Sequence, residues 1–157
     1  MDLISEQPPI NLHDPEWRIY SKSPCMPPHC VGGKARIIQS SITEGCNIYG
    51  EVEHSVVFAG VTVDEGARIV DSVLMPGAHI KAGATVERAI VGENSIVGRD
   101  SHVGAARLPS DGEYDTSLTD DITLIASGTE IADDSRVPVG MIVNTGTYGA
   151  KKEDDHA

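Results

Sequence analysis

Residues 54–104 repeat with a period of 17, and this repeat limits the possible folds more than any other feature of the chain. When the segments 54–70, 71–87 and 88–104 are aligned, nine aliphatic residues fall into three columns spaced five or six residues apart. The columns are Val57, Leu74 and Val91; Val63, Ile80 and Val97; and Ile69, Val86 and Val103. A fixed period of this length is typical of a solenoid, in which each repeat packs only against its neighbours.

Two further sets of columns predict the shape of each coil. A small residue lies two positions before each aliphatic one, so the two share a face of a short strand and both point inward. The small residues are Ser55, Ser72 and Ala89; Val61, Ala78 and Ser95; and Ala67, Ala84 and Ser101. Residues that tolerate a positive φ come just before two of these columns, namely Gly60, Gly77 and Asn94, and Gly66, Gly83 and Asp100. The chain is therefore expected to turn three corners per repeat and to form a triangular prism of short parallel strands, in preference to a β-sandwich.

The same four-residue pattern recurs at 34–37, 45–48, 128–131 and 134–137, which predicts about five coils. Between Ile48 and Val57 the spacing of the inward residues is shorter than in the later coils. Val52 is expected to fill the inward position of the face that lies between them. We therefore assign residues 31–143 to a β-helix and residues 105–121 to an acidic loop extruded from it. Residues 144–157 are assigned to a disordered tail, because they are rich in mixed charge and poor in apolar side chains.

Residues 1–30 do not repeat and are predicted to form an extended arm. They contain six of the nine prolines, which disfavours a helix. They also contain the single tryptophan. An aromatic side chain in a polar arm usually packs on a surface, so Trp17, Ile19 and Tyr20 are candidate contacts with the prism, another domain or another subunit.

The charge and hydropathy of the chain exclude several classes of function. Lys and Arg total 12 against 24 Asp and Glu, a formal charge of −12, which disfavours nucleic acid as a partner. No apolar run approaches the ~20 residues of a membrane span, and no signal peptide is recognisable. We expect no membrane partner and a cytoplasmic location. Cys25, Cys30 and Cys46 are too few for a disulfide framework and are expected to be reduced.

No motif for catalysis, a cofactor or a metal is present. There is no phosphate-binding loop, no paired nucleophile and base, and no set of metal ligands with the usual spacing. His79 and His102 each precede an inward aliphatic residue, so both are expected to point outward on different faces, while His54 occupies a corner. The basic residues form no stacked column, and an anionic effector would need a second domain or subunit to complete its site.

The arm and the repeat together resemble one enzyme family. The residues 11–20, which read NLHDPEWRIY, followed by Pro27 and Pro28, are similar to the linker of bacterial glucose-1-phosphate adenylyltransferase (ADP-glucose pyrophosphorylase). The stretches 45–52 and 55–61, and the closing segment 122–140, are similar to the β-helix of that family. The resemblance implies a left-handed parallel β-helix of the hexapeptide-repeat type, a handedness that the periodicity alone does not predict.

The resemblance also implies a role without catalysis. In that family a nucleotide-binding catalytic domain precedes this region, so the chain is expected to be a C-terminal fragment with no catalytic residues. Mg²⁺ would belong to the missing domain. The implied partners are the chain's own catalytic domain, sister subunits in a tetramer, and a sugar-phosphate or nucleotide effector. The implied role is assembly and allosteric control of an enzyme of glycogen synthesis that makes ADP-glucose from ATP and glucose 1-phosphate.

Two other hypotheses remain open at this stage. Acyltransferases also use the hexapeptide fold with a histidine base, so a free-standing acyltransferase would use His79 or His102. A scaffold with no small-molecule ligand is the third possibility.

Overall fold

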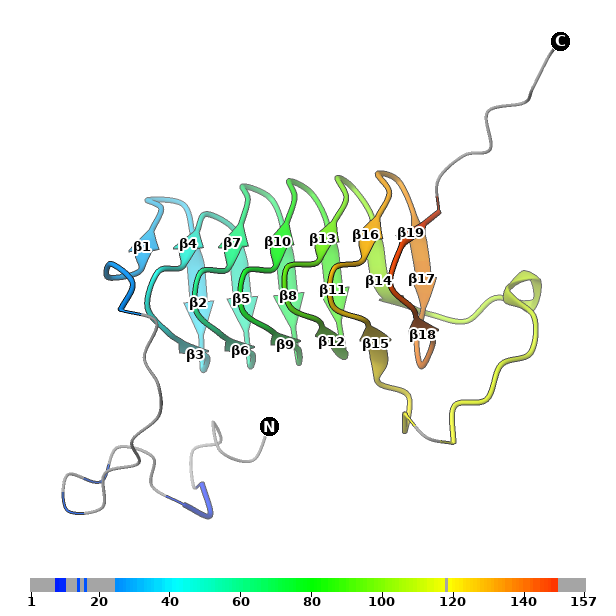
Figure 1. Cartoon of the computed structure of the whole chain (residues 1–157), viewed down its shortest axis with the longest axis horizontal. Coiled ribbons are helices and arrows are strands. Elements are labelled where there is room, and N and C mark those ends of the chain that lie inside the picture. The colour runs from blue at the N-terminus through cyan, green and yellow to red at the C-terminus, as the bar shows by residue number, and fades with distance from the viewer. Residues whose placement is uncertain (1–7, 11–13, 15, 17–24, 118, 150–157) are drawn as a thin grey trace, which may run out of the picture.

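The computed structural model describes residues 8–10, 14, 16, 25–117 and 119–149. Within these ranges the chain forms short strands and one 3₁₀ turn, η2 (Pro109–Asp111), and no α-helix. The strands wind into a three-sided column, as Figure 1 shows. Each side is a parallel sheet, and the chain visits the three sheets in turn, so each strand pairs with the strand one coil away.

We call the three sheets face A, face B and face C. Face A contains β1 (Cys30–Val31), β4 (Asn47–Ile48), β7 (Thr62–Val63), β10 (His79–Ile80), β13 (Ile96–Val97), β16 (Glu130–Ile131) and β19 (Thr147–Tyr148). Face B contains β2 (Arg36–Ile38), β5 (Glu51–Glu53), β8 (Arg68–Val70), β11 (Thr85–Glu87), β14 (His102–Ala105) and β17 (Arg136–Pro138). Face C contains β3 (Ser41–Ile42), β6 (Val56–Val57), β9 (Val73–Leu74), β12 (Ala89–Val91), β15 (Thr123–Ile125) and β18 (Ile142–Val143).

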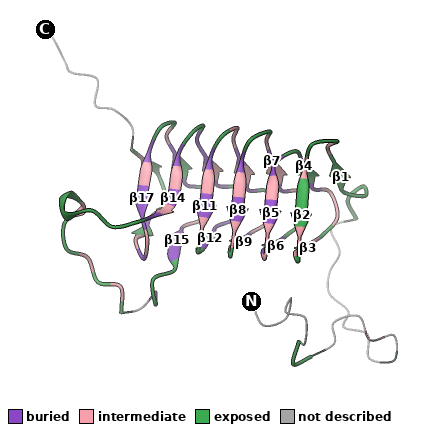
Figure 2. Cartoon of the chain, turned by 180° about the vertical axis from the view of Figure 1, so that it is seen from behind, coloured by how far each residue is buried: buried purple, intermediate pink, exposed green. Residues whose placement is uncertain are grey.

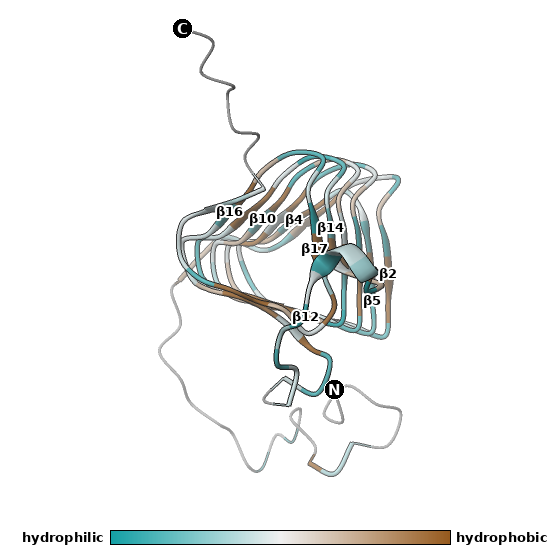
Figure 3. Ribbon diagram, turned by 90° about the vertical axis from the view of Figure 1, so that its right-hand side faces the viewer, coloured by the Kyte–Doolittle hydropathy of each residue, from teal (hydrophilic) through white to brown (hydrophobic). Residues whose placement is uncertain are grey.

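The coil is left-handed, as the family resemblance implied. Figure 3 looks at the end of the column that carries the last strands. In that view the chain passes clockwise from face A to face B to face C while it advances toward the viewer. This path is the opposite of the usual right-handed crossover.

The predicted coil count of about five was too low. Face A has seven strands in the described part of the chain, which makes about seven turns. The prediction missed β1 and β19 because their sequences lack the small-then-aliphatic pattern. In β19 the inward position is Tyr148, which pairs with Ile131 and closes the core with an aromatic ring. The last strand also extends the column beyond residue 143, into the segment that was assigned to the tail.

The strand register follows the sequence repeat over the middle coils. Thr62 pairs with His79, which pairs with Ile96, so each step equals one full period of the repeat. The second coil is shorter than this period, because Asn47 already pairs with Thr62. The shortening lies at the corner before Val52, where a side chain on Gly50 would collide with the backbone oxygen of Ala67.

Positive φ angles mark the corners. The predicted turn residues have them: Gly60 and Gly77 at 72°, Asn94 at 53°, Gly66 at 79°, Gly83 at 72° and Asp100 at 51°. The third corner of each coil, between faces B and C, is formed by His54, Asp71 and Arg88, with φ of 45° to 47°. This conformation is uncommon for residues with a side chain.

The core lies along the axis of the column, as predicted. All nine aliphatic residues of the three columns are fully buried, and so are Val52 and Ile48. Figure 2 shows buried residues along the middle coils and exposed ones at the β1–β2 end. Burial of each layer by the next stabilises the column, because no single coil could shield its own aliphatic residues from water.

Candidate interaction surface

The outward side chains give each face of the column a different chemistry. On face A they are mostly polar: Asn47, Thr62, His79 and Glu130, with one Ile96 among them. On face B they are mostly charged: Arg36, Glu51, Arg68, Thr85, His102 and Arg136. On face C they are aliphatic from the second strand to the last: Val56, Val73, Ile90, Leu124 and Ile142. Only face C therefore presents a continuous apolar stripe to the outside in the described part of the chain.

Face C is exposed in the isolated chain. Ile90 is 36% exposed and Ile142 is 47% exposed. Phe58, Met75 and Ile122 flank the stripe, and Phe58 is the single phenylalanine of the chain. Monomeric proteins rarely leave a contiguous apolar patch uncovered, so a patch of this kind indicates a contact site.

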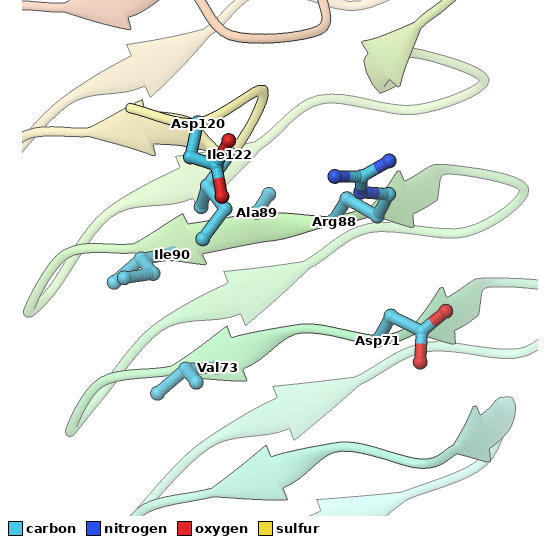
Figure 4. A pocket seen from close by; sticks show the side chains of 7 residues that line it. All are labelled: Asp71, Val73, Arg88, Ala89, Ile90, Asp120 and Ile122. Carbon is cyan, nitrogen blue, oxygen red and sulfur yellow. The ribbon is translucent and has the colours of Figure 1, made fainter. Parts of the chain in front are cut away.

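A hollow of about 560 Å³ lies over the middle of face C, where it meets the corner with face B. Figure 4 shows its lining: Val73 and Ile90 lie on neighbouring strands, with Ile122 beside them. Asp71, Arg88 and Asp120 form a charged edge at the corner. Asp71 also holds the ring of His54 from the previous coil, with 2.5 Å between Oδ1 and Nδ1. An apolar floor with a charged rim is the usual anatomy of a protein–protein contact.

The hollow has no group arranged for covalent or metal chemistry. The described residues that line it include no Ser, Cys or His. Across the described ranges, no group of three or more His, Cys, Asp or Glu side chains could hold a metal ion. Cys46 is buried, whereas Cys25 and Cys30 are exposed. Burial raises the pKa of the Cys46 thiol, which disfavours the reactive thiolate.

The histidines proposed as bases do not come together. His79 lies on face A, where its Nε2 is 3.0 Å from Asp64 Oδ2. His102 lies on face B, with its Nε2 3.4 Å from Glu87 Oε2. The prediction that they occupy different faces is confirmed. Each pairs with a carboxylate from the preceding coil, and neither lines the hollow on face C.

Ion pairs connect the coils along face B. Arg68 lies among three carboxylates, with Nη1 2.9 Å from Glu87 Oε1 and 3.7 Å contacts to Glu51 and Glu53. His102 and Arg136 are also direct neighbours on this face, in adjacent strands. The intervening loop separates them in sequence, which hid their adjacency.

The predicted packing residues Trp17, Ile19 and Tyr20 lie outside the described residues. The stripe on face C was missed by the sequence analysis, although a signal for it exists. Each strand of face C from β6 onward carries two adjacent apolar residues, whereas β7, β8, β10 and β11 place a polar residue before the inward aliphatic one. Two apolar neighbours in one strand indicate burial of both faces of a sheet.

Comparison with known proteins identifies the family. Residues 29–125 match the model described as GlmU-like, C-terminal hexapeptide, which is more than half of the chain. The chain belongs to this family. It is 45% identical over 130 residues to a glucose-1-phosphate adenylyltransferase of Bacillus cytotoxicus, covering 82% of this chain and 31% of that protein. It is 54% identical over 80 residues to the Bacillus cereus enzyme of the same name, covering 51% of this chain and 21% of that protein.

These matches confirm the resemblance to the β-helix domain of glucose-1-phosphate adenylyltransferase. The chain spans only a fifth to a third of the length of these relatives. Among solved structures, the acetyltransferase domain of PglB from Neisseria gonorrhoeae aligns with 74% of this chain and 51% of its own, at 19% identity and a TM-score of 0.38. That similarity carries no argument about activity. Among the described residues, no helix has the length and apolar character needed to cross a membrane.

Proposed function

We propose that this chain is a non-catalytic assembly and regulatory domain of a glucose-1-phosphate adenylyltransferase, and that face C is its contact surface. The catalytic domain or a sister subunit of that enzyme would cover the aliphatic stripe. The whole enzyme would form ADP-glucose and pyrophosphate from ATP and glucose 1-phosphate in the cytoplasm. Binding of a sugar-phosphate or nucleotide effector by the assembled enzyme is part of the same proposal.

The observation that carries the proposal is the outward aliphatic column of face C, in a chain homologous to one part of a larger enzyme. Val73 and Ile90 bring apolar surface to the middle of the face, and Asp71 and Arg88 supply a polar edge. Face C extends over about five strand spacings of ~4.8 Å and is roughly 18 Å wide, so it offers about 430 Å² per partner. This is small for a permanent dimer of isolated chains, which bury ~800 Å² each. We therefore expect weak self-association in the absence of the larger partner.

Sedimentation velocity over a range of concentrations tests this expectation. The unmodified chain should show a sedimentation coefficient that increases with concentration. Ile90→Glu should abolish the increase, because it places a charge in the apolar stripe. Ile96→Glu is the matched control, since Ile96 points outward from the polar face A in the next strand along the chain. Circular dichroism of both variants would confirm that the column is folded.

A chain that remains monomeric at every concentration would contradict the proposed contact surface. Equal loss of association in both variants would contradict the assignment to face C. The assembly role itself is tested separately by mixing the chain with a catalytic domain of a Bacillus relative and measuring binding by calorimetry. Binding that Ile90→Glu weakens at least tenfold, and Ile96→Glu does not, is the expected result.

A further inference from the structure

The described part of the N-terminal arm, residues 25–29, joins the column along the corner between faces C and A. At this corner a backbone N–H of one coil donates to a backbone oxygen of the preceding coil, as Gly77 does to Ala59 at 3.0 Å. The N–H of Gly45 donates to the oxygen of Pro27 at 2.7 Å. The arm therefore continues the hydrogen-bond ladder of the corner by one further step.

Glycines at this corner leave a shallow groove that one side chain of the arm fills. Gly45 and Gly60 are corner residues of successive coils, and neither brings a side chain. Met26 occupies this space, because an added Cβ on Gly45 would lie 2.6 Å from its Sδ and one on Gly60 would lie 3.2 Å from its Cε. The Met26 side chain thus extends from one corner to the next over bare backbone. An unbranched, polarizable thioether suits such an irregular surface.

Met26 is more exposed than the other methionines of the described ranges. It is 42% exposed, whereas Met75 and Met141 are partly buried and Met141 packs against the core. Oxidation of a sulfur side chain depends on its exposure. Met26 is therefore the methionine in this part of the chain that an oxidant in solution reaches most easily.

We propose that Met26 anchors the arm to the column and is a site of reversible oxidation that releases this anchor. The oxidant is hydrogen peroxide. The sulfur attacks one peroxide oxygen, the O–O bond breaks, and an S–O bond forms. The proton of the transferred OH passes to the leaving oxygen, which departs as water, so the sulfur loses two electrons and the peroxide gains them.

The sulfoxide does not fit the groove as the thioether does. It is polar and carries one more atom, a change that disrupts methionine packing. The sulfur has no room for that atom on the side of the column, since even an added Cβ on Gly45 would lie 2.6 Å from Sδ. Oxidation therefore frees residues 25–29 from the corner and breaks the hydrogen bond between Gly45 and Pro27.

The consequence for a larger enzyme rests on the proposed function. In that enzyme the arm connects the column to the catalytic domain, so release of Met26 loosens the attachment between the two. Reductases that convert methionine sulfoxide back to the thioether restore the anchor. The modification site itself lies entirely within this chain and needs no partner.

Mass spectrometry and amide hydrogen exchange on the full chain test the proposal. Under limiting hydrogen peroxide, Met26 should form sulfoxide several-fold faster than Met75 and Met141. The N–H of Gly45 should then exchange at least tenfold faster than in the unoxidised chain, whereas that of Gly77 should keep its rate. Methionine sulfoxide reductase should restore the original exchange rate. Dithiothreitol, which reduces cysteine disulfides and leaves the sulfoxide intact, should not restore it.

Two leucine variants assign the effect to one sulfur. Met26→Leu keeps an apolar side chain in the groove and cannot be oxidised, so peroxide should leave the exchange of the Gly45 N–H unchanged. Met75→Leu is the matched control, because Met75 lies beside the same corner in a later coil, and this variant should respond to peroxide as the original chain does. Circular dichroism of both variants would confirm that the column is folded.

Three results would overturn the proposal. The first is oxidation of Met26 no faster than that of Met75 and Met141. The second is an unchanged exchange rate of the Gly45 N–H once Met26 is fully oxidised. The third is the same response to peroxide in Met26→Leu as in the original chain. None of these results depends on the proposed enzyme, so the oxidation site and the assembly role can fail independently.

Discussion

Hydroxyl side chains along the corner between faces B and C each make two hydrogen bonds, one within their own coil and one to the next coil. Ser72 is fully buried; its Oγ donates to the oxygen of Val70 at 2.6 Å and accepts from the N–H of Ala89 at 3.2 Å. Ser55 bonds in the same way to Glu53 and to the N–H of Ser72. The corner residues His54 and Asp71, which directly precede these serines, have positive φ, so the backbone leaves the strand pairing there. The serine hydroxyl then accepts the N–H of the next coil in place of a backbone oxygen.

We expect Ser72→Ala to destabilise the column by about 1–3 kcal/mol, because the buried N–H of Ala89 would lose its acceptor. Urea unfolding followed by circular dichroism measures the change. Ser110→Ala is the control, since Ser110 is exposed in the loop and should leave the free energy of unfolding within about 0.5 kcal/mol of the original. Equal stability of the two variants would show that the hydroxyl bonds are dispensable.

At the scale of elements, the loop between β14 and β15 is fastened to the column and is more than a solvated acidic insertion. Asp111 accepts hydrogen bonds from the N–H of Leu108 at 2.7 Å and from Nη1 of Arg136 at 2.8 and 2.9 Å. The hydroxyl of Tyr114 donates to the oxygen of Val139 at 2.7 Å, and the guanidinium of Arg107 lies over its ring. The hydrogen bond from the N–H of Leu108, and then the hydrogen bond from the Arg136 guanidinium, lower the pKa of the Asp111 carboxyl.

These contacts predict a stability that depends on pH. A lowered pKa in the folded state means that the contribution of Asp111 is complete above its ordinary pKa of about 3.9 and is lost as the pH falls through the lower folded value. Asp111→Asn should therefore lower the urea midpoint at pH 7 and change it much less at pH 3. Glu113→Gln removes the same charge from the same loop and should show no such difference. A midpoint for Asp111→Asn that shifts equally at both pH values would contradict the assignment.

At the scale of the whole molecule, the loop interrupts the repeat without changing its register in the following coil, apart from a bulge at the loop's start, where Ala105 pairs with Pro138. Ile96 pairs with Glu130, and the sequence between them amounts to two periods of the repeat. The loop and its junctions thus occupy the length of one coil. The strands on either side stack directly, and the core columns continue from Val97 to Ile131 and from Val103 to Val137.

Deletion of residues 106–122 should therefore leave the column folded, because Ala105 would join Thr123 and restore the single period of the repeat. The far-UV circular dichroism spectrum should be retained, while unfolding should occur at lower urea because Asp111 and Tyr114 no longer contact the last coils. Deletion of residues 106–121 is the matched control, since a one-residue error in register reverses the faces of the following strands. Retention of fold in both deletions would show that the register is not set by this spacing.

The amount that the sequence could predict differed between the inside and the outside of the column. The inward columns repeat strictly because each interior position, such as that of Val63, meets the same neighbours in every coil. A strictly repeated environment selects a strictly repeated residue, so periodicity alone predicted the strands, two of the three corners and the core. Strands β1 and β19 were not predicted, because Val31 and Tyr148 have a neighbour on one side only and their sequences depart from the pattern.

The sequence by itself determined a triangular parallel column, its repeat length and the residues that fill it, since these follow from local geometry and from burial at a fixed spacing. Only the tertiary structure decided which outward residues become neighbours across the loop. Val56, Val73 and Ile90 share one column of the repeat, but Leu124 and Ile142 join their stripe, and His102 meets Arg136, only after the loop is spanned and the coils on either side of it stack. The physical reason is that the loop interrupts the spacing, so the sequence no longer indicates which outward positions before and after it lie side by side.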